Sequence, residues 1–157
     1  MLLRSLFFAS FMLISMMGYA QRKSTITNSW GDQGGAYYNR MHNTILEQAI
    51  TDAMTKGRNG LGCVVTFAAG NYPGVMDYPG NFHDDILTVG SIESNGSRSS
   101  FSGYGTKLDV VAPGNNILST LPNNSTGSKN GTSMATPHVA GIARWSFPII
   151  RHSLAYK

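Results

Sequence analysis

The residues best suited to carrying out chemistry lie in one segment, Asn130–Gly141, where a glycine-containing turn leads into a predicted helix. Ser133 is expected among the first residues of this helix, beside backbone N–H groups without helical partners and near the positive end of the helix dipole. These groups would stabilise an oxyanion that forms on a substrate carbonyl next to the serine hydroxyl. Pro137 is compatible with the helix because we expect it in the first turn, where a missing N–H costs little. Many serines at such positions serve only as helix N-caps, and position alone leaves both roles open.

The rest of the chain alternates between helix-like and strand-like stretches that must position this segment. Apolar residues recur at helical spacing from about Asn43 to Lys56, which predicts an amphipathic helix. A polar loop is expected at Asn123–Asn130, before the helix that begins near Ser133. A short strand is expected at Ser24–Ser29. Apolar runs at Cys63–Ala68, Ile86–Val89 and Leu108–Val111 predict strands of a parallel sheet buried on both faces, and Ile117–Thr120 is a weaker run of the same kind. This order predicts an α/β fold with helices on the faces of the sheet.

Composition narrows the classes of function. The chain has 157 residues, of which 13% are charged, and a formal net charge of +4; this fits one globular domain and argues against a disordered chain. No basic cluster is present, so a nucleic-acid partner is not expected. Cys63 is the only cysteine, which excludes an internal disulfide and a multi-cysteine metal site and suggests a buried packing thiol. A nucleotide-binding domain is disfavoured because no glycine-rich phosphate motif follows a strand.

Residues 1–20 form a separate compositional block. Arg4 precedes an apolar run from Leu6 to Met17, and small residues stand three and one positions before Gln21. This pattern predicts a secretory signal peptide cleaved after Ala20, and hence a secreted or extracytoplasmic protein. The run is too short for a membrane span, which needs about 20 residues. A buried strand or helix that follows a wrongly chosen start codon is the alternative.

The string from Asn130 to Gly141 resembles the nucleophile motif of the subtilisin-like serine proteases. Other segments match that family in order and at compatible spacing: Asn28–Gly31, Phe67–Asn71, Asp77–Pro79, Ile86–Gly90, Ser100–Ser102 and Leu108–Gly114. The resemblance runs from about Ile26 to Ala143, roughly three quarters of the chain. It implies the C-terminal part of the family's catalytic domain, a partial three-layer sandwich with a mostly parallel sheet flanked by helices.

The resemblance also implies roles for individual residues. Ser133 would be the nucleophile that attacks the scissile peptide carbonyl, and Asn71 would donate its side-chain amide to the resulting oxyanion. Ser29, Trp30 and Gly31 would pair as an edge strand with an extended polypeptide substrate. The wall of the pocket for the side chain before the cut would be formed by Ala68, Ala69 and Gly70. No cofactor is required by this chemistry; structural calcium, which some relatives hold, is left open.

The base and the orienting carboxylate that such a serine needs are not recognisable. The family carries them in Asp-(Thr/Ser)-Gly and His-Gly-Thr-His contexts, and neither string occurs in the 157 residues. None of the four histidines is a credible substitute: His42, His83, His138 and His152. We therefore expect residues 21–143 to be an incomplete peptidase domain that depends on a complementary N-terminal segment for folding and for activity. The alternative is a non-catalytic relative or fragment that binds extended peptides without cleaving them.

Residues 144–157 depart from the family pattern. Arg144, Trp145 and Ser146 interrupt the apolar face of the last helix, and Pro148 is expected to end that helix. A shift of reading frame near codon 143 would account for this atypical tail.

Overall fold

The computed structural model describes residues 25–154 of the chain. The predicted signal peptide at residues 1–20 lies outside this range, so its cleavage stays a prediction. The helices and strands that follow the predicted leader are, in chain order, β1 (Thr25–Asn28), α2 (Tyr38–Met41), α3 (Thr44–Thr55), α4 (Gly57–Gly60), β2 (Val64–Ala68), β3 (Leu87–Ile92), β4 (Val110–Pro113), β5 (Ile117–Leu121), β6 (Ser125–Lys129) and α5 (Thr132–Leu154).

A four-stranded parallel sheet in the order β1-β2-β3-β4 forms the centre of the molecule. Its strands are short and rich in β-branched residues, as a sheet covered on both faces requires. In the register, Asn28 at the end of β1 lies beside Phe67, and Ala68 at the end of β2 lies beside Val89. The carboxyl ends of β1 and β2 therefore meet at one edge, which brings the segments that follow these two strands together.

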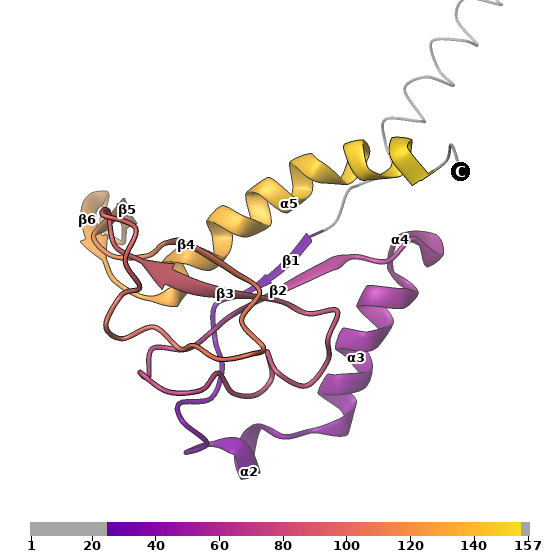
Figure 1. Ribbon diagram of the computed structural model, residues 1–157, viewed down its shortest axis with the longest axis horizontal. Coiled ribbons are helices and arrows are strands. Elements are labelled where there is room, and N and C mark those ends of the chain that lie inside the picture. The colour runs from indigo at the N-terminus through magenta and orange to yellow at the C-terminus, as the bar shows by residue number, and fades with distance from the viewer. Residues whose placement is uncertain (1–24, 155–157) are drawn as a thin grey trace, which may run out of the picture.

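Helix α3 covers one face of the sheet and α5 covers the other (Figure 1). Asn43 caps α3 by accepting a hydrogen bond from the N–H of Ile45 at 2.8 Å, which explains why the helix begins there. On the α3 side, Ile50 packs with the buried residues Val65, Phe67 and Ile86. The predicted amphipathic helix is therefore confirmed, and its apolar face lies on β2 as the sequence pattern requires.

The opposite face of the sheet is covered by α5. Ala135 and Val139 of this helix form a buried cluster with Val89 of β3 and Ala112 of β4. The prediction that Pro148 ends the helix is wrong, because α5 continues to Leu154. A proline inside a helix removes one hydrogen bond and crowds the preceding turn, which bends a helix without having to end it. The three layers α3, sheet and α5 confirm the predicted α/β class.

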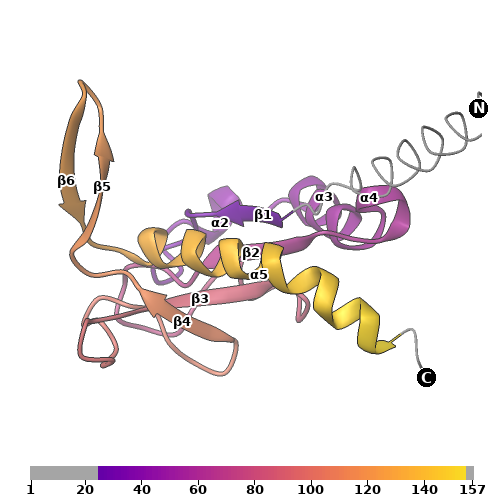
Figure 2. The same ribbon diagram turned by 90° about the horizontal axis from the view of Figure 1, so that it is seen from above.

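The segment expected to be a polar loop at 123–130 instead contains β6, which pairs with β5 in an antiparallel hairpin. Figure 2 shows this hairpin projecting from the body of the molecule. Residues 122–124 form its turn, in which Asn123 and Asn124 have φ angles of 62° and 53°. Asparagine tolerates this left-handed conformation better than most residues, and two such residues make a tight hairpin turn. The polar composition of β6 reflects strands that are largely exposed on both faces.

Candidate active site

Two glycines, Gly114 and Gly131, hold the turn before α5, because each lies so close to neighbouring atoms that a side chain would crowd them. Gly131 has a φ of 152°, and its N–H donates to the carbonyl of Gly114 at 2.8 Å. A Cβ on Gly114 would lie 2.7 Å from the carbonyl oxygen of Gly131, and a Cβ on Gly131 would lie 3.2 Å from Nδ2 of Asn71. Side chains at these two positions would push the turn away from Asn71.

Asn71 reaches the same turn from the end of β2. Its Oδ1 accepts hydrogen bonds from the N–H of Thr132 at 2.8 Å and from the Thr132 hydroxyl at 3.0 Å. Because both contacts require an acceptor, they set the orientation of the amide, and Nδ2 is the end that remains available to donate. Thr132 is 1% exposed, and its carbonyl accepts the Thr136 hydroxyl at 2.8 Å. The structure therefore brings Asn71 to the residue directly before Ser133, as a shared oxyanion site requires.

Thr132 is a site residue that the sequence analysis missed. It stands between Gly131 and Ser133 inside the nucleophile-like string, and that position was the only signal that could have singled it out. Its contribution depends on a contact across 61 positions of the chain, which residue order does not reveal.

Ser133 and Ser29 are joined by a reciprocal pair of hydrogen bonds. The Ser133 hydroxyl donates to the carbonyl of Ser29 at 3.0 Å, and the Ser29 hydroxyl donates to the carbonyl of Ser133 at 3.0 Å. Within residues 25–145, no histidine or carboxylate hydrogen-bonds the Ser133 hydroxyl. His138, five residues along α5, is exposed. The described part of the chain thus places the serine at a helix N-terminus without a neighbouring base.

The two segments predicted to meet the substrate lie against each other. If Gly31 carried a Cβ atom, that atom would lie 4.0 Å from the carbonyl oxygen of Ala68 and 3.5 Å from the carbonyl oxygen of Tyr78. A Cβ atom on Gly70 would lie 3.5 Å from the carbonyl oxygen of Asp32. The Tyr78 ring packs edge-on against Tyr38, with ring centroids 5.7 Å apart, and its burial raises the pKa of the phenol.

Residues 29–31 follow β1 without belonging to a strand. The indole ring of Trp30 meets Phe67 edge-on, with ring centroids 5.2 Å apart, and the side chain is 44% exposed. Ala68 and Ala69 are buried, and Gly70 has a φ of 91°. The structure brings all the predicted site residues to one end of the sheet.

Neither a metal site nor a membrane-spanning helix is found in the part of the chain that the structure describes. Among the described side chains, at residues 25–145, no group of three or more His, Cys, Asp and Glu could hold a metal ion. None of the described helices is long and apolar enough to cross a bilayer.

A polar cavity near His83 is bordered by Asp84 and Lys107, which form an ion pair. The hydrogen bond from Lys107 lowers the pKa of the Asp84 carboxyl. Cys63, expected to be buried, is half-buried just before β2.

The four-stranded parallel sheet between α3 and α5 agrees with the partial α/β fold expected of the subtilisin-like family. Over residues 9–145, the chain matches the family model described as Peptidase S8, the subtilase family. The chain belongs to this family, which confirms the resemblance drawn from its motifs.

Three curated relatives show how much of the family's sequence the chain covers. It is 46% identical over 99 residues to M-protease of Shouchella clausii (strain KSM-K16), an alignment that covers 62% of this chain and 24% of the relative. It is 46% identical over 99 residues to Subtilisin Savinase of Lederbergia lenta, and this alignment covers 62% of the chain and 35% of the relative. It is 44% identical over 105 residues to Subtilisin DY of Bacillus licheniformis, and this alignment covers 64% of the chain and 36% of the relative. The chain therefore spans about a quarter to a third of the length of these relatives.

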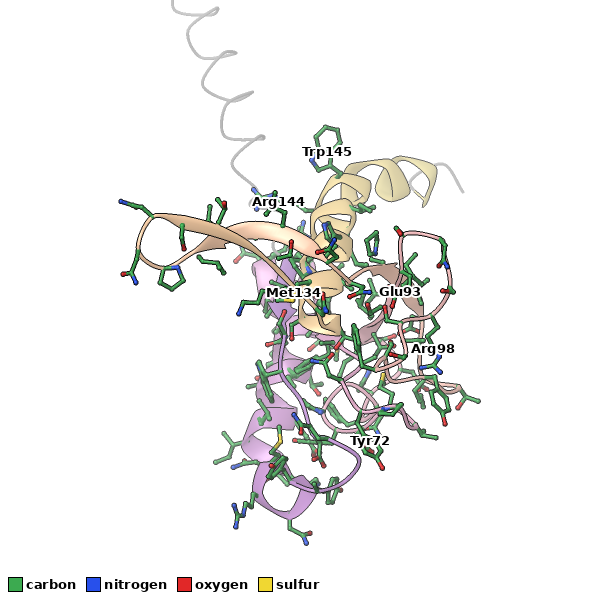
Figure 3. The ribbon with its side chains drawn as sticks, turned by 90° about the vertical axis from the view of Figure 1, so that its left-hand side faces the viewer. Tyr72, Glu93, Arg98, Met134, Arg144 and Trp145 are labelled. Atoms are coloured by element: carbon green, nitrogen blue, oxygen red, sulfur yellow. The ribbon has the colours of Figure 1, made fainter. Side chains whose placement is uncertain are left out.

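Met134, directly after the serine, supports a prediction about oxidation. The side chain is half-buried at the start of α5 (Figure 3), so a sulfoxide would add a polar oxygen next to Ser133. In an active enzyme that contains this segment, we expect peroxide to lower kcat by at least about tenfold. The Met134→Leu variant, which keeps an apolar side chain of similar size, should be resistant. Equal inactivation of both proteins would show that Met134 is not the sensitive position.

Proposed function

We propose that the chain carries the nucleophile and oxyanion-binding part of a secreted serine endopeptidase. Ser133 attacks the scissile carbonyl, and the Asn71 Nδ2 and the N–H of Ser133 donate to the oxyanion that results. The observation that carries this proposal is the pair of hydrogen bonds from Thr132 to Asn71 Oδ1, which holds the asparagine next to Ser133 with its donor end available. The leader-like pattern at residues 1–20 supports export.

The substrate in this proposal is a polypeptide in extended conformation. It pairs with the backbone of Ser29-Trp30-Gly31, and Ala68-Ala69-Gly70 forms one wall for the side chain before the cut. Small residues suit that wall because a larger side chain would fill the space that the substrate must occupy. The contact between the two segments, seen in the approach of Gly31 to Ala68, supports this assignment.

A complementary N-terminal segment supplies the base and its carboxylate. Serine hydrolysis needs both, and the Ser133 hydroxyl donates to a carbonyl rather than to a histidine in the described residues. Exposed apolar side chains on β1 and on α5 support a segment that covers them: Ile26 is 39% exposed and Trp145 84%. Figure 3 shows Trp145 pointing away from the body of the molecule. A segment that pairs with β1 and packs on α5 would cover this surface.

The decisive experiment supplies the missing part from a relative. In a chimera, residues 25–143 of this chain, which include Ser29, Asn71 and Ser133, replace the corresponding C-terminal part of the catalytic domain of Subtilisin Savinase. We expect the chimera to hydrolyse a peptide anilide, to be inhibited by phenylmethylsulfonyl fluoride, and to melt cooperatively. We expect the full chain alone to show no hydrolysis above a Ser133→Ala control.

Each outcome separates the candidate functions. A folded chimera that hydrolyses nothing would contradict the endopeptidase proposal. If such a chimera still bound extended peptides, it would favour the alternative of a non-catalytic peptide binder, for which the exposed backbone after β1 is the supporting observation. Hydrolysis by the chain alone would show that no complementary segment is needed.

A further inference from the structure

Pro137 leaves a carbonyl at the start of α5 without its helical partner. The helix begins at Thr132, so Pro137 is its sixth residue and not part of the first turn, as the sequence had suggested. In an α-helix the carbonyl of Ser133 would accept the N–H of residue 137, four positions on, and proline has no N–H. The backbone of the proposed nucleophile therefore lacks one of the bonds that would hold it in the helix.

The hydroxyl of Ser29 takes the place of that missing donor. It reaches the Ser133 carbonyl at 3.0 Å from 104 positions away in the sequence. In return, the Ser29 carbonyl accepts the hydroxyl of Ser133 at 3.0 Å. The two bonds fix both the backbone and the side chain of Ser133 against the segment that follows β1.

We propose that Ser29 is a positioning residue for Ser133: its hydroxyl replaces the N–H that Pro137 cannot supply, and its carbonyl holds the Ser133 hydroxyl while no peptide is bound. The significance for catalysis rests on the proposed function, because Ser29 also begins the segment assigned to substrate pairing. An N–H of the incoming peptide competes for the same carbonyl. When a substrate N–H binds the Ser29 carbonyl oxygen, the Ser133 hydroxyl loses its acceptor and is released.

A double-mutant cycle in the chimera, which supplies the complementary segment and is expected to melt cooperatively, tests this role without relying on activity. Ser29→Ala leaves the Ser133 carbonyl unsatisfied, and we expect the ratio of folded to unfolded protein in urea to fall by about five- to tenfold. In a Pro137→Ala background, the introduced alanine supplies the helical N–H, and the same Ser29→Ala change should cost less than about twofold. Ser29→Thr, which keeps the hydroxyl, should behave like the parent. Ser94→Ala, at an exposed serine in the turn after β3, is the matched control.

The carbonyl-carbon NMR resonance of Ser133 gives a second, local measurement that needs no unfolding transition. Loss of a hydrogen bond should move this resonance to lower chemical shift in Ser29→Ala, but not in Ser29→Thr or in the double variant Ser29→Ala with Pro137→Ala. Equal destabilisation by Ser29→Ala in both backgrounds, or an unmoved Ser133 resonance, would overturn the positioning role. Either result would leave the endopeptidase proposal standing, since that proposal is tested by hydrolysis in the chimera.

Discussion

Replacing Ser133 by alanine in the Savinase chimera is expected to lower kcat by about a millionfold, the size of loss known when the nucleophile is removed from subtilisin itself. The hydroxyl forms the covalent bond to the substrate carbonyl, and no other group in the site can take its place. Asn71 and the helix N-terminus would still bind an oxyanion, so about 10³–10⁴-fold catalysis over water should remain. The measurement is kcat on a peptide anilide with enzyme purified from a protease-deficient host.

The control for this variant is Ser94→Ala, an equally small change at an exposed serine away from the site, which should leave kcat unchanged. Circular dichroism and the melting temperature must match between the two variants for the comparison to count. A folded Ser133→Ala chimera that retains more than about 1% of the parental kcat would mean that another residue is the nucleophile.

Replacing Asn71 by leucine in the chimera is expected to lower kcat by about 10²–10³-fold while KM stays nearly the same. This range is the one found for loss of the oxyanion donor in subtilisin, so it is carried over from the family. KM is spared because the donor acts on charge that develops only in the transition state. Steady-state kinetics over a range of substrate concentrations separates the two parameters.

Asn71 also holds Thr132 in place, and a second variant distinguishes that structural role from donation. Asn71→Asp keeps oxygen acceptors for the N–H and hydroxyl of Thr132 but removes the NH₂ donor. If donation is the important role, Asn71→Asp should lose as much kcat as Asn71→Leu. Recovery of most of the activity in Asn71→Asp would show that the asparagine acts mainly by anchoring the start of α5.

Several features of the fold could be predicted from local pattern alone. The amphipathic stripe from about Asn43 to Lys56 predicted α3, and the apolar run through Val65 and Phe67 predicted a strand buried on both faces. These predictions succeeded because each depends on residues that are neighbours within one element. The predicted strand at Ile117–Thr120 is β5, but it belongs to an exposed hairpin and not to the parallel sheet. Strand β6 was missed because it is polar and exposed, so only its pairing with β5 makes it a strand.

The sequence by itself determined the family and the identities of the residues that could do chemistry, because a run such as Gly131-Thr132-Ser133 is specific in residue type and order. Only the tertiary structure decided how those residues meet. The contact of Asn71 with Thr132 joins residues 61 positions apart, and the exchange of hydrogen bonds between Ser29 and Ser133 joins residues 104 positions apart. Both arise because the parallel strands end at one edge of the sheet and α5 begins there, a convergence that belongs to the topology of the sheet and not to any local stretch of sequence.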